Sequence, residues 1–365
     1  MTISNEAVII IPGLISQEKG DYLNLLSTCL TEQLEGSITV KEIGELKIEG
    51  NTGRRLNVYV DSNHLKNVDI YEVDWRDLFN NKLSERNLKD RLIEGTYLLF
   101  YWILSKTWLI FKEVPSLVIN LGFCLVLLVT WYYGTITMAM TAIGEDPSFL
   151  EGKLLPGWAE NIGNLGKAMG GWSVWLIVSA LLSFIPIGKV IDQADFVKRY
   201  LSENFEGRNL RAKTRSRAIA VVNDVLANGK YQKVTVLAHS FGVAIGTDML
   251  SNYSHQQTVH YITLGSVLKF FSIKSKWVEK EIYECLNNPT LASWIDYYSE
   301  QDWFGTKTPL PKGVTSSKIQ YKEVSINSSL IERIAGKTHD CLLYFTEPKV
   351  LQAIINVNDQ NSLNL

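Results

Sequence analysis

The stretch at residues 234–246, VTVLAHSFGVAIG, constrains the fold of this chain more than any other. It begins with an apolar, β-branched run that favours a buried strand, and it continues into residues that favour a helix. Ser240 lies between the two parts, two positions after Ala238 and two positions before Gly242. A serine on a sharp strand-to-helix turn holds a strained backbone, and small neighbours let the strand and the helix approach each other. The spacing therefore predicts a nucleophile elbow.

The same turn predicts a donor for an oxyanion. Phe241 is expected to be the first helical residue after Ser240. The N–H groups of a helix N-terminus have no intrahelical acceptors and carry partial positive charge. We therefore expect the backbone N–H of Phe241 to face the oxygen of a carbonyl that Ser240 attacks.

A serine hydroxyl is a poor nucleophile unless a base takes its proton, and five histidines are available for that role. His239 is adjacent to Ser240 and is expected to point away from it. His339 follows the last expected strand in a loop, as the chain order nucleophile, acid, base requires. We therefore expect His339 to be the base. The histidines that this choice excludes are His64, His239, His255 and His260.

The base in turn needs an acid that holds its tautomer and stabilises its cation. The acid is expected in the loop after the next-to-last strand, where Asp302 lies. Asp296, inside that strand, is the competitor, and Glu300 is a more distant one. Because aspartates within strands more often cap or pair structurally, Asp302 is the preferred candidate.

The pattern of the whole chain predicts an α/β fold. Apolar or alternating runs indicate strands at residues 7–11, 38–48, 54–60, 68–73, 258–264, 291–298 and 319–326, besides the strand that ends at the elbow. Helical patterns lie at residues 19–34, 212–227 and 276–286 and from about residue 341. Strands that alternate with helices favour a mostly parallel central sheet with helices on both faces.

The sequence Ala-His-Ser-Phe-Gly at residues 238–242, with Asp302 and His339 in the order given, resembles the α/β-hydrolase superfamily, in particular its lipase and serine-esterase branch. The resemblance covers about residues 7–75 and 210–356. It departs from the commonest pattern in having Ala238 in place of glycine, and Ile-Pro-Gly at residues 11–13 where many members have His-Gly.

This resemblance implies a Ser-His-Asp triad that forms an acyl-enzyme intermediate. It also implies a second oxyanion donor in the glycine-containing turn after the first strand. That donor would be the backbone N–H of Leu14, with Ile15 as the runner-up, and a simple Pro-Gly turn is the structural alternative.

A hydrophobic helical insertion is expected at residues 76–193, between a first part of the core at residues 1–75 and a second part at residues 194–365. Charged residues are absent between Glu113 and Glu145 and between Lys167 and Lys189. A helix needs about 20 apolar residues to cross a bilayer. The two runs thus predict transmembrane helices at about residues 115–143 and 171–188, or alternatively a buried or interfacial hairpin. Residues 95–111 are expected to form an interfacial helix.

Basic residues on the outer flanks of this insertion predict its orientation. By the positive-inside rule, both ends would face the cytoplasm, at an inner or plasma membrane, with the hydrolase part on the cytoplasmic side. The amino terminus lacks the basic region of a signal peptide, which agrees with this expectation. A further basic cluster indicates either a solvated helix start or contact with anionic headgroups: Arg208, Arg211, Lys213, Arg215 and Arg217.

Composition limits the function classes. The formal net charge of −2 and a pI near 6.3 give no global reason to expect a nucleic-acid partner. The four cysteines form no metal-ligand spacing, so we interpret them as reduced packing residues, and neither a metal nor an organic cofactor is implied.

The preferred hypothesis is a membrane-anchored serine hydrolase that cleaves acyl esters, with a lipase or phospholipase activity as the leading reading. A thioesterase or peptidase with the same triad is the first alternative. A non-catalytic, membrane-tethered interaction or effector module is the second, and it would require a broken triad.

Overall fold

The structure is a computed structural model in which the following residues are described: 3–14, 18–34, 36–48, 51–79, 85–104, 106–113, 115–146, 157–170, 172–173, 176–177, 180, 187–202, 205–227, 231–255, 257–302, 304–315, 317–326 and 339–357.

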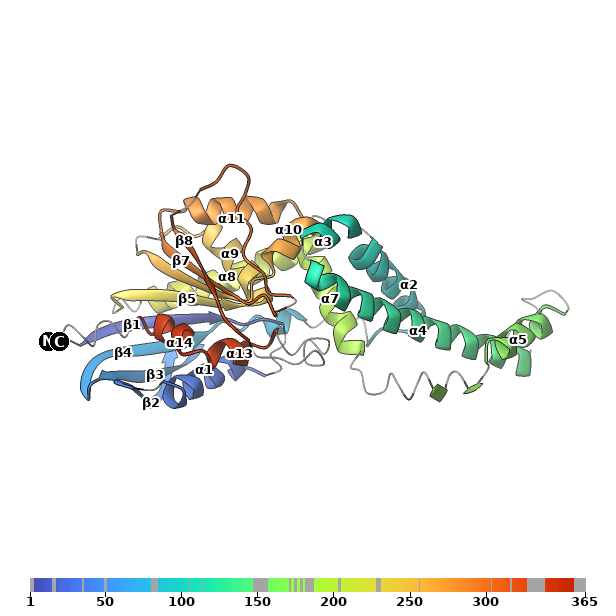
Figure 1. Ribbon diagram of the computed structural model, residues 1–365, viewed down its shortest axis with the longest axis horizontal. Coiled ribbons are helices and arrows are strands. Elements are labelled where there is room, and N and C mark those ends of the chain that lie inside the picture. Colours follow the sequence, from blue (N-terminus) through green and yellow to red (C-terminus); the bar gives the residue numbers. More distant parts are fainter. Residues whose placement is uncertain are drawn as a thin grey trace. The chain divides into compact units, whose positions relative to one another are not determined.

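Strands of the described residues form one mixed sheet of eight strands (Figure 1), in the spatial order β2-β3-β4-β1-β5-β6-β7-β8. Strand β3 is antiparallel to both of its neighbours, β2 and β4, whereas the pairs from β4 and β1 through to β7 and β8 are parallel. The mostly parallel sheet of the sequence analysis is thereby confirmed. The strands are β1 Ser4–Ile11, β2 Ile38–Ile48, β3 Asn51–Val60, β4 Asn63–Glu72, β5 Lys233–His239, β6 Val259–Leu264, β7 Leu291–Tyr298 and β8 Ile319–Glu323.

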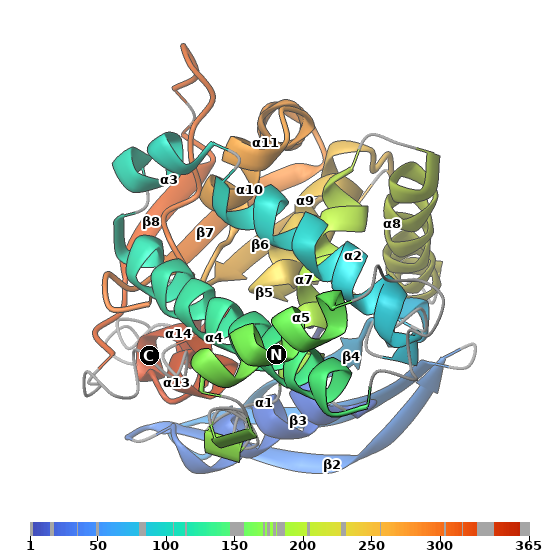
Figure 2. The ribbon, with the colours of Figure 1, turned by 90° about the vertical axis from the view of Figure 1, so that its right-hand side faces the viewer.

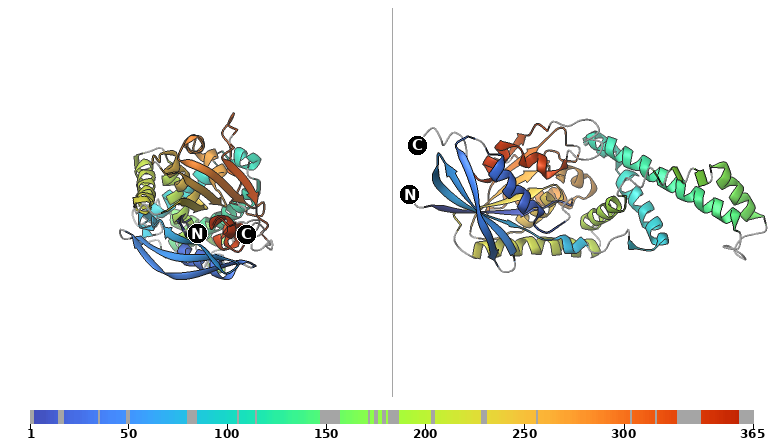
Figure 3. Two further views of the ribbon diagram at one scale, coloured as in Figure 1. Left: turned by 90° about the vertical axis from the view of Figure 1, so that its left-hand side faces the viewer. Right: turned by 90° about the horizontal axis from the view of Figure 1, so that it is seen from below.

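Helices cover both faces of this sheet, as expected from the alternation of strands and helices. One face packs against α1 (Asp21–Glu32), α13 (Cys341–Phe345) and α14 (Pro348–Ile354), which share a hydrophobic core with β1 to β4. The other face packs against α8 (Phe205–Ala227), α9 (Phe241–Ser251) and α11 (Trp277–Asn287). Figure 3 shows the two helix layers on either side of the sheet. Because β1 lies between β4 and β5 and under both layers, its last five residues are fully buried.

The chain divides into two compact units, each described by itself. One unit comprises Met1–Asn81, Lys106–Leu117 and Phe196–Leu365 and contains the sheet. The other comprises Lys82–Ser105 and Val118–Asp195. The remaining elements are η1 Arg76–Phe79, α2 Leu88–Leu99, the π-helical turn η3 Phe100–Leu104, α3 Thr107–Glu113, α4 Pro115–Glu145, α5 Trp158–Ala168, α7 Ile187–Leu201 and α10 Leu268–Lys274.

Two small-residue contacts bring α4 and α5 together within the second unit. A Cβ atom added to Gly163 would overlap the backbone of Gly144, and one added to Gly166 would lie 2.7 Å from the backbone nitrogen of Thr141. The helices therefore approach closely only because these positions carry no side chain. Thr137 and Thr141, one turn apart on α4, are both buried.

The structure describes the first of the two expected membrane spans but only a small part of the second. Residues 115–143 fall on the continuous helix α4, whereas most of residues 171–188 lie outside the described residues. Within the described part of the chain, no helix combines the length and the apolar character that crossing a bilayer requires.

The expectation of one continuous helix at residues 95–111 was wrong, whereas its placement at a membrane surface stays a prediction. The segment is divided into the end of α2, the turn η3 and most of α3. Lys106 has a φ of 59° immediately before α3. A lysine in this left-handed region cannot continue a right-handed helix, so the chain breaks there.

Three arginines of the basic cluster on α8 are paired with acidic side chains of other elements. The guanidinium of Arg215 lies 3.2 Å from Asp248, and that of Arg211 lies 3.4 Å from Glu281. Arg217 pairs with Asp77 of η1. These arginines therefore join α8 to its neighbouring elements.

Candidate active site

Ser240 occupies a strained turn between β5 and α9, as its neighbours predicted. Its φ of 56° lies in the left-handed region, which is unusual for a residue other than glycine. A Cβ atom added to Gly242 would overlap the carbonyl oxygen of Ile11, at the end of β1. Ala238 is completely buried, which leaves little room for a larger side chain. The small neighbours of Ser240 therefore let α9 approach the sheet.

The structure brings Ser240, His339 and Asp302 together in one hydrogen-bonded chain. The Nε2 atom of His339 lies 2.6 Å from the Oγ atom of Ser240. Its Nδ1 atom lies 2.9 Å from each carboxylate oxygen of Asp302. With the imidazole proton on Nδ1, facing the carboxylate, Nε2 is the acceptor for the hydroxyl proton. The three residues follow β5, precede α13 and follow β7, and all are at least nine-tenths buried.

Asp302 is held in place by donors other than the histidine. The backbone N–H groups of Phe304 and Gly305 donate to Oδ1 at 3.0 and 2.8 Å, and the hydroxyl of Tyr344 donates to Oδ2 at 2.8 Å. Burial by itself raises the pKa of Asp302, but the charge of His339 and these hydrogen bonds outweigh it, so the pKa is lowered. The carboxylate is therefore ionised, as a partner of the imidazolium must be.

Two glycines make room for this carboxylate. A Cβ atom on Gly305 would overlap Oδ2 of Asp302, and one on Gly265 would lie 3.0 Å from the same oxygen. Gly265, directly after β6, also has a φ of 57°. Both positions therefore require glycine.

The competing acids occupy other places. Asp296 is fully buried on β7, where it accepts hydrogen bonds from the hydroxyl of Thr263 at 2.5 Å and the backbone N–H of Thr308 at 2.7 Å. Burial raises the pKa of Asp296 to about 6. Its contacts are those of a residue that joins β6, β7 and the following loop. Glu300 is exposed.

The other four histidines lie in surroundings of their own, three with a side-chain hydrogen-bond partner and one exposed. His239 is buried, and its Nδ1 lies 2.8 Å from the hydroxyl of Tyr22. Burial, with the nearby charge of His339, lowers the pKa of His239 to about 3, so this imidazole stays neutral. His64 bonds Asn67 on β4, and His260 bonds Ser293 across β6 and β7. His255 lies exposed in the loop before β6.

The two expected oxyanion donors lie in segments that flank Ser240. Phe241 is the first residue of α9, where the N–H groups have no acceptor within the helix. The turn after β1 reaches Ser240 from the other side, since a Cβ atom on Gly13 would lie 2.9 Å from that of Ser240. Leu14 follows directly, whereas Ile15 lies outside the described residues.

Sequence reasoning missed Tyr344 and Tyr22. Tyr344 bonds the acid from α13, five positions after the base, and Tyr22 bonds His239 from α1. Neither tyrosine lies in a motif, and both contacts depend on how helices pack on the sheet. No local signal in the sequence marks either tyrosine, although Tyr344 lies in the helix directly after His339.

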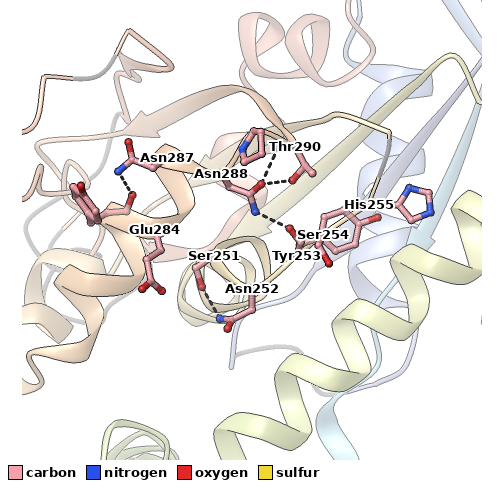
Figure 4. Close-up of a pocket in the computed structure, with 11 residues that line it drawn as sticks. Ser251, Asn252, Tyr253, Ser254, His255, Glu284, Asn287, Asn288 and Thr290 are labelled. Atoms are coloured by element: carbon pink, nitrogen blue, oxygen red, sulfur yellow. Dashed lines mark hydrogen bonds between the residues drawn. The ribbon is translucent and has the colours of Figure 1, made fainter.

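A cavity of about 690 Å³ lies elsewhere in the same unit (Figure 4). It is lined by the end of α9, the end of α11 and the residues just before β7, such as Asn252, Asn287 and Thr290. These residues belong to the amino edge of the strands, whereas Ser240 belongs to the carboxyl edge. The cavity is therefore separate from the triad. In the part of the chain that the structure describes, no group of three or more His, Cys, Asp or Glu side chains is arranged to hold a metal ion.

Compared with protein-family models, with curated proteins and with solved structures, the chain matches none of them.

Proposed function

We propose that this chain is a serine hydrolase of the α/β-hydrolase type that cleaves acyl esters. The observation that carries the proposal is the unbroken chain of hydrogen bonds from Ser240 through His339 to Asp302, on a strand-to-helix turn. A buried serine hydroxyl has no structural need for a histidine that is itself oriented by an ionised carboxylate. Nucleophilic catalysis does have that need.

Each step of the reaction has a residue to perform it. The Oγ atom of Ser240 would attack the ester carbonyl while Nε2 of His339 takes the hydroxyl proton. Asp302 would stabilise the resulting imidazolium, and the N–H groups of Phe241 and Leu14 would hold the oxyanion. His339 would then pass its proton to the leaving alcohol. Water would release the acyl group by the same steps in reverse, with His339 again as the base.

For the substrate we propose a lipid ester, with the activity at a membrane. The support is the aromatic and apolar sequence between β4 and β5, which contains a run of about 31 uncharged residues. Exposed aromatic side chains occur on it, among them Tyr97, Phe100 and Trp158. Such a segment in the same chain as an acyl-transfer site suits an apolar substrate better than a soluble one.

The test is covalent labelling of the purified full chain with a fluorophosphonate probe. Wild-type protein is expected to react, Ser240→Ala to lose all labelling, and His339→Ala and Asp302→Asn to react at least about 10³-fold more slowly. The matched control is Asp296→Asn, which removes the charge of the competing buried aspartate and is expected to keep most of the labelling. Folded wild-type protein that does not react, or a Ser240→Ala variant that reacts like wild type, would contradict the proposal.

A further inference from the structure

The short helix α3 presents an apolar side chain almost completely to the outside. Trp108 is 81% exposed and is followed by Leu109, which is 45% exposed, while Ile110 is buried. Tryptophan is normally among the more buried residues, and a monomer gains nothing from leaving its indole in water. Trp108 and Leu109 therefore form an exposed apolar pair on α3.

This helix is fixed on α10 at both of its ends. The Nζ atom of Lys106, just before α3, donates to the carbonyl of Ile273 at 2.6 Å, near the end of α10. At the other end of α3, Glu113 lies 3.8 Å from Lys269, near the start of α10. The two helices are thus antiparallel and pack together, and Trp108 projects from a rigid support.

The pair carries a strong excess of positive charge. Residues 106–113 and 268–276 contain five lysines and a single acidic residue, Glu113, which Lys269 already pairs. Lys106 and Lys274 lie close together, since the Nζ atom of Lys106 is 3.4 Å from the carbonyl oxygen of Lys274. The lysines are Lys106, Lys112, Lys269, Lys274 and Lys276.

The same surface lies beside the candidate active site. The inner side of α10 carries Phe271, whose ring centroid is 6.0 Å from that of Phe241, the neighbour of Ser240. The helix also begins three residues after Gly265, which borders Asp302. Figures 1 and 2 show α3 and α10 at the carboxyl edge of the sheet, the edge at which β5 meets α9.

We propose that the α3–α10 surface, made of Trp108, Leu109 and the exposed lysines Lys112 and Lys276, docks on an anionic lipid bilayer. A tryptophan suits the headgroup region, where its ring is half buried, and lysine ammonium groups on the same surface are attracted to anionic phosphates. Trp108 is exposed over most of its surface, which suits contact with a soft lipid surface. The carboxyl edge of the sheet would then face the bilayer. The role of this surface in substrate supply rests on the proposed function, but the docking does not.

The test places a fluorescent reporter at the tip of the surface. Full-length Trp108→Cys, labelled with an environment-sensitive NBD dye, is mixed with phosphatidylcholine vesicles with and without phosphatidylserine. The matched control is Tyr283→Cys, an exposed aromatic at the opposite edge of the same unit, 49% exposed. Unsubstituted protein treated with the dye gives the background from native cysteines.

On vesicles with phosphatidylserine, we expect a blue shift and a several-fold loss of iodide quenching at position 108 but not at position 283. Added salt should reduce both effects because it screens the lysines. A reporter at 108 that stays as accessible as the one at 283 would overturn the proposal and leave the surface to a protein partner. Fluorophosphonate labelling without vesicles tests the proposed function separately, so the two failures are distinguishable.

Discussion

Tyr22 is the residue that joins the two sides of the candidate oxyanion site. Its hydroxyl accepts a hydrogen bond from the backbone N–H of Gly13 at 3.2 Å. The hydroxyl proton is then available for Nδ1 of His239, which lies 2.8 Å away. One side chain thus links the turn before Leu14 to the residue before Ser240.

Tyr22→Phe removes this link while it keeps the ring. We expect fluorophosphonate labelling to slow by about tenfold, because the turn that carries Leu14 loses its fixed position. The free energy of unfolding should fall by about 1–2 kcal/mol, because His239 keeps a buried acceptor without its donor. Tyr283→Phe, which removes an exposed hydroxyl, is the control. An unchanged labelling rate in Tyr22→Phe would mean that the turn is held by other contacts.

His239 makes the folded chain sensitive to acid. Its pKa is lowered to about 3 by burial and by His339, whereas an unfolded chain takes up this proton near pH 6.5. Between these values the unfolded state binds one proton more, so stability falls as the pH falls, by up to about 1.4 kcal/mol per pH unit. His239→Asn, whose Oδ1 can still accept from Tyr22, should remove this dependence. Denaturant unfolding between about pH 4 and 7 measures the slope, and an equal slope in both proteins would refute the assignment.

At the scale of elements, α8 is attached to α9 and α11 through a buried ionic cluster. Asp248 on α9 is completely buried and lies 3.2 Å from Arg215 and 3.6 Å from Arg211. Burial raises the pKa of Asp248 to about 6, even with both arginines beside it. The pairs thus compensate for a charge that the packing of α9 has removed from water.

Arg215→Met therefore leaves Asp248 with one partner fewer. We expect a loss of about 3 kcal/mol in the free energy of unfolding at neutral pH. Because the folded pKa of Asp248 is raised, the carboxylate takes up a proton as the pH falls through about 6, and the loss should shrink below that pH. Lys213→Met, on the exposed side of the same helix, is the control and should change stability little. A loss that does not depend on pH would point to packing and not to charge.

The elements themselves followed from the sequence because each depends on a local pattern. The alternating hairpin of β2 and β3, the buried runs of β1 and β7 and the elbow at Ser240 were all predicted from spacing. Asp302 and His339 followed from their order along the chain. The hydroxyls of Tyr22 and Tyr344 could not be found in this way, because tertiary packing alone brings them to the site. The break at Lys106 was missed because it is a matter of one backbone angle.

At the scale of the whole molecule, the two compact units have separate packing. The contact of Gly163 with Gly144 belongs to the second unit, whereas the triad and the sheet belong to the first. Gly163→Leu should force α4 and α5 apart, because a Cβ atom already overlaps the facing backbone.

Hydrogen exchange can follow each unit in this variant. We expect amide protection to fall in α4 and α5 and to persist in β1 and β5, with fluorophosphonate labelling retained, since local unfolding follows compact units. Gly122→Leu, at a position of α4 where an added Cβ atom meets nothing within 4 Å, is the control. Loss of protection in β1 as well would mean that the units unfold as one.

The position of β1 between β4 and β5 has a consequence for biosynthesis. Its partner β4 ends at Glu72, but its partner β5 begins only at Lys233, about 160 residues later. At about 5–20 residues per second, a ribosome needs on the order of 10–30 s to make that segment. For this time the apolar edge of β1 has no strand beside it, and such an edge is a template for pairing with other chains. Slower translation of this segment therefore lengthens the time for which the edge of β1 can pair with other chains, until the strand that carries the nucleophile arrives.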